Sequence, residues 1–375
     1  MKKFRLKYKA AALILSAAFL LTGCGKKNGE LEDTQFPPAD LSISETARMK
    51  DPKSLTITRD GEFKNPLTGR WIDVKYMYQR PIAVQYENTS LANPQYGMTH
   101  ADFIYEMYVE GGITRLMAIF TEYDKVEKFE PIRSDRHYYD RKAVEYDAIH
   151  VFCGASDYAN ENDLYQNHYP YLDFIDLISD PGLRRDDTRY APHNAYTLPS
   201  DIDSEITRKG FSRTHRSYYQ ENHKFLDEFT ELDGTVAEVV TIPFSNNRPW
   251  FEYYEDDRVY YRYQFGDEQV DYENRWQLFA TNILIQFVHY SDLPGYENAG
   301  SQDIDWSGSG EGYYCTAGKM IPVTWKNENY TTRWYRLNGE ELKMNPGKTW
   351  ISVYKDTNKE GVLFEAKQAE EQEEQ

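Results

Sequence analysis

The sequence predicts an α+β protein in which a mixed α/β N-terminal domain is followed by a β-rich C-terminal domain. The chain has 375 residues, which is enough for two ordinary domains. From about residue 235 onward, short runs of β-branched and aromatic residues alternate with turn residues, as in an all-β domain. Before that point, strand-like runs are followed by helix-like segments, which is typical of an α/β arrangement.

The first 23 residues have the pattern of a bacterial lipoprotein signal. Basic residues precede an apolar run over residues 10–21, which is too short to cross a bilayer that needs roughly 20 residues. Thr22 and Gly23 are small enough for a signal peptidase, and the Cys24 thiol that follows can accept a diacylglycerol. We therefore predict lipidation at Cys24, with acyl chains such as palmitate. The expected location is the extracytoplasmic face of the cell membrane.

Composition restricts the partners of the chain. The 61 acidic and 43 basic residues give a net charge of −18, and the charged residues of the signal are all basic. Such a surface repels nucleic acid and anionic lipid, so we expect no nucleic-acid partner and contact with the membrane through the lipid alone. The histidines and cysteines lack the spacing of metal sites, so we expect no metal and no cofactor. Cys153 and Cys315 are expected to be buried thiols, although a disulfide between them remains an alternative.

Further boundaries follow from changes in composition. Residues 24–60 are polar and without periodicity, which predicts a flexible tether. Residues 61–200 form the predicted mixed domain, which carries a polar cleft, and the charge-rich residues 201–234 are expected to form a helical linker. The β-rich domain is expected over residues 235–356. Residues 357–375 end in a run of Glu and Gln and predict an acidic, disordered tail.

In the first domain, alternating and apolar runs predict strands and two polar residues predict helix starts. Ser134 and Ser156 are positioned to cap helices, because a Ser side chain at this position accepts a backbone N–H hydrogen bond. The expected elements are strands over residues 82–87, 101–110 and 113–120, a helix over 135–146, a buried strand over 147–153 and a helix over 157–166.

In the second domain, β-branched and aromatic runs predict strands over residues 236–240, 258–263, 282–288 and 350–354. Asn338-Gly339 between two such regions is a strong hairpin signal. The glycine-rich run 308–312 resembles a phosphate-binding loop only superficially, because no lysine follows it. We expect a glycine-rich hairpin there.

Two glutamates are candidates for catalysis. If Gly111-Gly112 is a two-residue turn, Tyr108 lies opposite Arg115, and Glu106, Tyr108, Glu110 and Arg115 all point to one face. Glu106 and Glu110 would then offer paired carboxylates for general acid and base chemistry on a glycan. The alternative is a solvated face held by ion pairs, because four strand residues span roughly 13 Å and glycosidase carboxylates lie closer together.

Basic residues gather at a predicted helix start and on a later loop. A helix N-terminus favours an anion, and arginines beside it can bind a carboxylate or phosphate. The alternative is that these residues form salt bridges with the acidic body, and His150 could equally be a core histidine. The predicted ligand-binding residues are Arg115, Arg133, Ser134, Arg136, His150, Arg189, His193 and Asn194.

A serine nucleophile is the weaker hypothesis. Ser134 and Ser156 could each act with His150 or His193, but the Gly-x-Ser-x-Gly motif of a nucleophile elbow is missing. Cys153 lies in an apolar strand, where a thiol is expected to be inert.

Four motifs give the chain a family resemblance. They are Glu-Met-Tyr-Val-Glu-Gly-Gly-Ile-Thr-Arg at 106–115, Pro-Ile-Arg-Ser-Asp-Arg at 131–136, Ala-Pro-His-Asn at 191–194 and Asn-Pro-Gly-Lys-Thr-Trp at 345–350. In this order the chain resembles the YerB-like family of bacterial lipoproteins over about residues 65–354. The resemblance implies a lipid anchor and two adjoining domains of unknown function, and it brings no established reaction. Asp135 and His137 depart from the small or apolar residues expected there.

Together these observations predict a cell-envelope lipoprotein that binds an anionic or sugar-bearing ligand derived from peptidoglycan. Arginines would hold a carboxylate or phosphate, and tyrosines would pack against the sugar. One alternative is an enzyme that cleaves wall glycan with Glu106 and Glu110. Another is a protein-interaction module for envelope machinery. The residues alone do not decide whether the protein is an enzyme.

Overall fold

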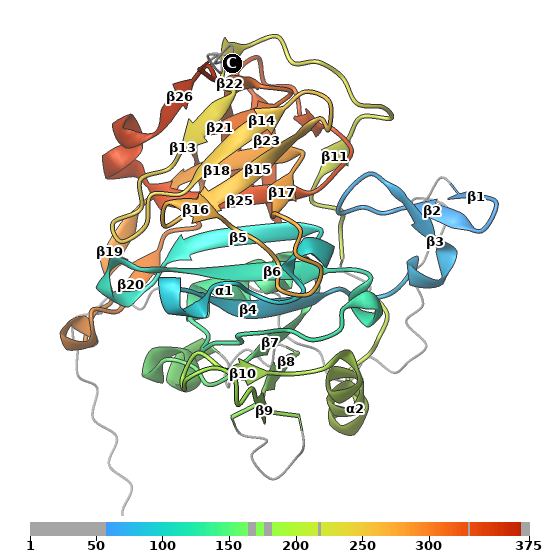
Figure 1. Ribbon diagram of the computed structural model, residues 1–375, viewed down its shortest axis with the longest axis vertical. Coiled ribbons are helices and arrows are strands. Elements are labelled where there is room, and N and C mark those ends of the chain that lie inside the picture. Colours follow the sequence, from blue (N-terminus) through green and yellow to red (C-terminus); the bar gives the residue numbers. More distant parts are fainter. Residues whose placement is uncertain (1–57, 164–169, 176–181, 217–218, 329–330, 369–375) are drawn as a thin grey trace, which may run out of the picture. The chain divides into compact units, whose positions relative to one another are not determined.

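The structure is a computed structural model that describes residues 58–163, 170–175, 182–216, 219–328 and 331–368 (Figure 1). The predicted signal, Cys24 and nearly all of the predicted tether lie outside these residues. The described part begins with strand β1 (Thr58–Arg59), which pairs with β2 (Glu62–Lys64). No helix in this described part is long and apolar enough to cross a membrane.

Within the described residues, eleven strands form one mixed sheet that takes strands from both halves of the chain (Figure 1). In spatial order its strands are β12 (Thr235–Val236), β22 (Lys319–Glu328), β21 (Ser309–Thr316), β18 (Asn282–Val288), β25 (Thr349–Lys355), β5 (Phe103–Tyr108), β6 (Thr114–Phe120), β4 (Ile82–Asn88), β7 (Ile149–Phe152) and β8 (Tyr171–Asp173), with β23 (Thr331–Arg336) beside β22.

The two halves of the chain join where β25 runs parallel to β5. Ile351 lies opposite Tyr105, and Ser352 lies opposite Glu106. Both strands are buried on both faces, so their sequences are mostly apolar and lack an alternating solvent-facing polar side. The two regions predicted as separate domains therefore share one continuous sheet.

A second sheet packs on one face of the first. Phe251 and Tyr260 of the second sheet share a core with Ile283 and Trp350 of the first. In order its strands are β16 (Asp267–Glu268), β15 (Val259–Gln264), β14 (Trp250–Tyr254), β13 (Val239–Thr241) and β26 (Leu363–Glu365), with β17 (Phe279–Ala280) beside β15.

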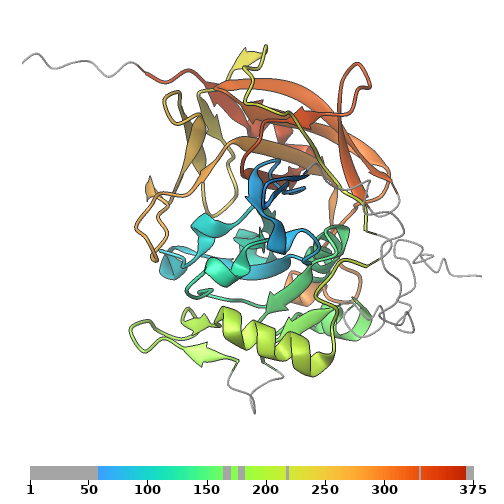
Figure 2. The same cartoon turned by 90° about the vertical axis from the view of Figure 1, so that its right-hand side faces the viewer.

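Two α-helices cover the sheet of the first half. Helix α1 (His137–Glu145) buries Tyr138 and Tyr139 in the core on the face opposite the second sheet. Helix α2 (Pro199–Lys209), the yellow-green helix in Figure 2, buries Ile202 and Ile206 in the core on the other face. Pro199 stands at its first position and Gly210 ends it with a left-handed φ of 70°, as expected for helix ends.

Short strand pairs and turns complete the described structure. The additional strands are β3 (Trp71–Asp73), β9 (Arg184–Arg185), β10 (Ala195–Tyr196), β11 (Lys224–Phe225), β19 (Tyr290–Asp292), β20 (Gln302–Ile304) and β24 (Lys343–Met344). The 3₁₀ turns are Val74–Tyr76, Ser90–Ala92, Met98–His100, Glu110–Gly112, Tyr123–Lys125, Glu297–Ala299 and Asp356–Gly361, and Ala159–Asp163 is a π-helical turn.

The strand-rich class is confirmed, whereas an α/β architecture for residues 61–200 stays a prediction. In the described part of the helix expected over 157–166, Asp157 and Tyr158 are α-helical and Ala159–Asp163 is a π-helical turn. Among the described residues of the expected helical linker over 201–234, the α-helix ends at Lys209, and β11 lies further along.

The prediction of a disordered tail from residue 357 is wrong for its first part. β26 pairs with β13, and the ring of Phe364 lies 5.1 Å from that of Tyr313. The surrounding acidic residues led to the prediction of disorder. The apolar run Val362-Leu363-Phe364 between them is ordered because it pairs with the edge strand β13. Residues 369–375 lie outside the described part.

Candidate functional site

The hairpin that carries the two glutamates has a different register from the predicted one. The N–H of Val109 donates to the carbonyl of Ile113 at 2.9 Å, so the turn has three residues, Glu110–Gly112. Gly111 and Gly112 both have a φ of 71°, which a Gly adopts without strain. Glu106 therefore lies opposite Leu116, and Arg115 lies opposite Met107. The prediction of one shared face is wrong, because a shift of one residue moves Arg115 to the other side of the sheet.

Glu106 lies inside the molecule, between the two sheets. Its Oε2 atom lies 2.7 Å from Nη2 of Arg262 in β15, and both side chains are fully buried. Its Oε1 atom accepts hydrogen bonds from Asn88 Nδ2 at 3.1 Å and from Thr114 Oγ1 at 2.9 Å. These contacts describe a structural ion pair, and a catalytic role of Glu106 stays a prediction.

Glu110 is held by the guanidinium group of Arg136. Arg136 Nε donates to both carboxylate oxygens, at 2.7 and 2.9 Å, and Nη2 donates to Oε2 at 2.7 Å. Burial favours a higher pKa of Glu110, but the hydrogen bonds and charge of Arg136 outweigh it and lower the pKa. A general acid needs a raised pKa, so this environment favours an ion pair over proton donation.

Three arginines meet around the segment that leads into α1. Arg115 Nη1 donates to the carbonyl of Ser134, and Arg133 Nε lies 3.2 Å from Oε2 of Glu87. Burial and, after it, the positive charges of Arg136 and Arg133 lower the pKa of Arg115 to about 10. We call Arg115, Arg133 and Arg136 the arginine cluster.

The predicted residues of the later loop lie at two different places. His193 Nδ1 lies 2.7 Å from Glu87 Oε1, so His193 and Arg133 share one carboxylate. Arg189 lies elsewhere, where it donates to the carbonyl of Ala92 at 3.2 Å and its Nε lies 3.7 Å from Glu130 Oε1.

Asn194 holds its own loop together. Its Nδ2 atom donates to the carbonyls of Asp186 and Arg189, at 3.1 and 3.2 Å. The structure therefore brings together Arg115, Arg133, Ser134, Arg136 and His193, whereas Arg189 contacts other partners.

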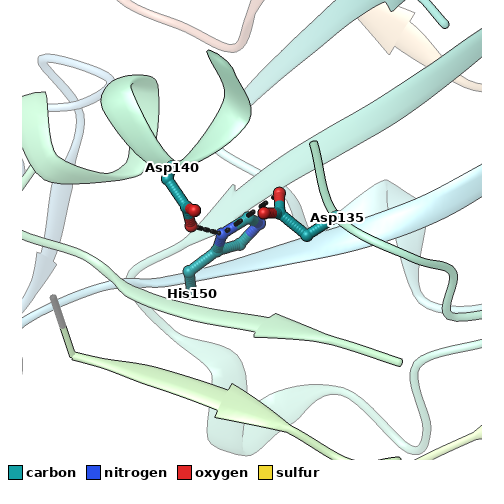
Figure 3. A group of neighbouring side chains, drawn as sticks. All are labelled: Asp135, Asp140 and His150. Carbon is teal, nitrogen blue, oxygen red and sulfur yellow. Dashed lines mark hydrogen bonds and ion pairs between the residues drawn. The ribbon is translucent and has the colours of Figure 1, made fainter. Parts of the chain in front are cut away.

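A buried group of two carboxylates and one imidazole lies beneath the same segment (Figure 3). His150 Nδ1 lies 2.7 Å from Asp140 Oδ1 and 3.7 Å from Asp135 Oδ1. His150 lies in β7, Asp140 lies in α1 and Asp135 lies just before that helix. Burial and, after it, the charge of Asp140 raise the pKa of Asp135 well above its usual value, and burial lowers the pKa of His150. We call these three residues the Asp–His group.

Sequence reasoning missed this group. Asp135 and Asp140 are five residues apart across a helix start, and His150 is one of eight scattered histidines. The sequence offers one indication of the group, which is a helix with acidic residues in and before its first turn, followed by a buried strand that contains a His. This pattern is weak without the fold.

The two remaining cysteines are separate. Cys153 and Cys315 are free and buried, so no bridge joins them. Burial raises the pKa of Cys153 to about 11, in agreement with the expected inert thiol.

The chain is similar to known proteins along most of its length. Residues 67–212 match the family described as the "Protein of unknown function (DUF3048) N-terminal domain", and residues 240–351 match the C-terminal domain of the same family. The chain is 29% identical over 302 residues to "Putative lipoprotein YerB" of Bacillus subtilis (strain 168), covering 79% of this chain and 87% of that protein.

A crystal structure of the YerB protein from Bacillus subtilis has a similar fold. Its TM-score is 0.72 at 27% sequence identity, with 81% of this chain and 99% of the other chain covered. Both domain matches occur in order in one chain, and the YerB-like resemblance of the four motifs is confirmed. The chain belongs to the DUF3048 family, whose two domains have no assigned function.

Proposed function

We propose that this protein is a lipoprotein, anchored through Cys24 to the extracytoplasmic face of the cell membrane, that binds an anionic ligand derived from peptidoglycan at the arginine cluster. The pattern of residues 1–24 supports the anchor, and so does the printed name of the Bacillus subtilis relative. The arginine cluster supports the class of ligand.

The observation that carries the proposal is the local surplus of positive charge. Arg115, Arg133 and Arg136 meet two glutamates, Glu87 and Glu110, and Glu87 is shared with His193. The three guanidinium groups outnumber the two glutamates that contact them, in a chain whose net charge is −18. Like charges close together repel, and a bound anion would remove that repulsion.

The geometry suits a carboxylate. A guanidinium group can donate two parallel hydrogen bonds to one carboxylate, as Arg136 already does with Glu110. The side chain of Arg133 is 27% exposed, so a ligand from outside can reach it. Peptidoglycan carries many carboxylates, whereas neutral polysaccharides do not.

The test is co-sedimentation of the full chain, purified in detergent, with insoluble peptidoglycan. We expect Arg133→Gln and Arg136→Gln to reduce the bound fraction several-fold, and raised salt to do the same for the wild type. Arg184→Gln is the matched control, because Arg184 is a partly exposed arginine paired with Asp201 on α2. Equal binding by all four proteins would refute the proposal, as would wild-type protein that stays in the supernatant.

The same experiment addresses the enzymatic alternative. Soluble muropeptides released by the wild type and not by Glu106→Gln would indicate glycan cleavage and would contradict a pure binding role. The buried ion pair of Glu106 leads us to expect no release.

A further inference from the structure

We propose that Asp135, Asp140 and His150 bind one divalent transition-metal ion, with Zn²⁺ as the best match. This inference does not depend on the arginine cluster binding an anion. It rests on the positions of the three side chains, on their burial and on their hydrogen bonding.

The three side chains offer ligand atoms that converge on one point (Figure 3). One ligand atom from each residue lies within 4.8 Å of the other two. The Nδ1 atom of His150 lies 2.7 Å from one carboxylate and 3.7 Å from the other. Ligand atoms at about 2.0–2.2 Å from a tetrahedral zinc ion lie about 3.3 Å apart. The two distances from His150 Nδ1 lie on either side of this value.

The backbone holds Asp135 in this position. Its N–H donates to the carbonyl of Gly154 at 2.8 Å, and its carbonyl accepts from the N–H of Ser156 at 3.2 Å. Asp135 is thereby bridged to the loop that follows β7, the strand of His150. Two neighbouring elements thus present their ligand atoms before any metal binds, which reduces the entropic cost of binding.

The hydrogen bonding of the group is incomplete. Asp135 is 0% exposed, and among the described residues its carboxylate oxygens make no well-formed hydrogen bond, although the Asp140 carboxyl and the Arg136 N–H lie near them. Asp135 and Asp140 can share a hydrogen bond while one of them holds a proton, but two ionised carboxylates this close in a buried site repel each other at a cost. A cation between the carboxylates would offset this cost.

The donor set selects the kind of metal. One imidazole nitrogen and two carboxylate oxygens are common zinc ligands, whereas Ca²⁺ and Mg²⁺ prefer oxygen alone. Three protein ligands leave a fourth tetrahedral position to a small non-protein ligand. Asp135 is flanked by Ser134 and Arg136, so the ion would also hold the segment that carries Arg133 and Arg136 of the arginine cluster.

The test is a calorimetric titration of the metal-stripped full chain, without a histidine tag, with Zn²⁺. We expect one tight site in the wild type. We also expect an affinity more than about 100-fold lower in Asp135→Asn and in His150→Gln, because even loss of a residue that only orients a ligand costs roughly 10- to 100-fold. Folding of each variant is checked by circular dichroism.

His137→Gln is the matched control. His137 is also a buried histidine beside a carboxylate, with Nε2 2.8 Å from Asp303 Oδ1, but it has no place in the Asp–His group. We expect its zinc affinity to equal that of the wild type. Zinc binding that survives in both Asp135→Asn and His150→Gln would overturn the proposal, and so would a wild type that binds none.

A second measurement uses only the wild type, so it tests the proposal even if the variants fail to fold. Co²⁺ in a tetrahedral site of nitrogen and oxygen ligands absorbs visible light more strongly than hydrated Co²⁺. We expect this absorption to appear at one equivalent and to disappear on addition of Zn²⁺. A spectrum identical to that of hydrated Co²⁺ would contradict the proposed site.

Discussion

Nη2 of Arg262 lies 2.7 Å from Oε2 of Glu106, and both side chains are completely buried. Glu106 belongs to β5 of the eleven-stranded sheet and Arg262 to β15 of the second sheet, so the pair joins the two sheets. The guanidinium carbon of Arg262 also lies 4.2 Å from the ring centre of Trp350 in β25. The ion pair and this cation–π contact together connect one N-terminal strand with two C-terminal ones.

Glu106→Gln is expected to lower the free energy of unfolding by about 3–5 kcal/mol, because it leaves the Arg262 charge buried without a counter-charge. Urea denaturation at neutral pH measures the change. Glu62→Gln is the control, since Glu62 pairs with Arg59 on the surface, where loss of a pair costs about 0–1 kcal/mol. A similarly small decrease in the free energy of unfolding for Glu106→Gln would show that the Glu106–Arg262 pair does not stabilise the contact between the two sheets.

Asp147 predicts a pH dependence of stability. Burial raises its pKa, but the hydrogen bond with His215 and the charges of Arg80 and Arg216 outweigh this and lower it from 3.8 to about 2. The pKa is lower in the folded state, so the stabilisation is fully present above about pH 4 and is lost as the pH falls toward 2.

Asp147→Asn should therefore cost about 2 kcal/mol at pH 7, and the difference from wild type should shrink as the pH is lowered below 4. Asn suits this position because Asp147 has a φ of 50°, which Asn tolerates. Urea denaturation of both proteins from pH 7 to pH 3 checks the expectation, with exposed Asp60→Asn as the control. A difference that stays constant over this range would contradict the assigned pKa.

Gly312→Ala is expected to destabilise the protein by about 2 kcal/mol through overpacking. A Cβ atom at residue 312 would lie 2.5 Å from the carbonyl oxygen of Ile285 and 2.8 Å from the ring of Trp334. Gly361→Ala is the control, because its nearest neighbour is the Pro243 side chain at 3.3 Å. Thermal unfolding of both variants measures the effect, and equal midpoints would show that the strand relaxes around the added methyl group.

Cys153 and Cys315 are expected to resist alkylation in the native protein. Burial raises the pKa of both thiols, that of Cys153 to about 11, and the thiolate is the reactive form. Iodoacetamide at pH 8 followed by mass spectrometry should find both unmodified in the native state and both modified in denaturant. Rapid native labelling of either residue would mean that its strand opens.

The amino-acid sequence was sufficient for many of the local elements. The apolar runs over residues 82–87, 282–288 and 350–354 occur as β4, β18 and β25, because strands buried on both faces require such runs. The Asn338-Gly339 turn also occurs, with Gly339 N–H donating to the carbonyl of Arg336. The four motifs were sufficient for the family.

What the sequence could not decide depended on contacts between distant residues. Two consecutive glycines allow a two- or a three-residue turn, and the observed choice moved Arg115 away from the face of Glu106. The parallel pairing of β25 with β5 joins segments about 250 residues apart, and no local pattern reports it.

The candidate sites also combine features that local sequence patterns predict with features that depend on contacts between distant residues. Sequence alone predicted Arg133, Ser134, Arg136 and His150 as ligand-binding residues, because charge and helix-start patterns are local, and this role stays a prediction. Only the tertiary structure decided that Glu106 pairs with Arg262, that Glu110 pairs with Arg136, and that His150 faces two aspartates. Burial and electrostatic neighbours determine what a titratable side chain can do, and both are properties of the folded chain.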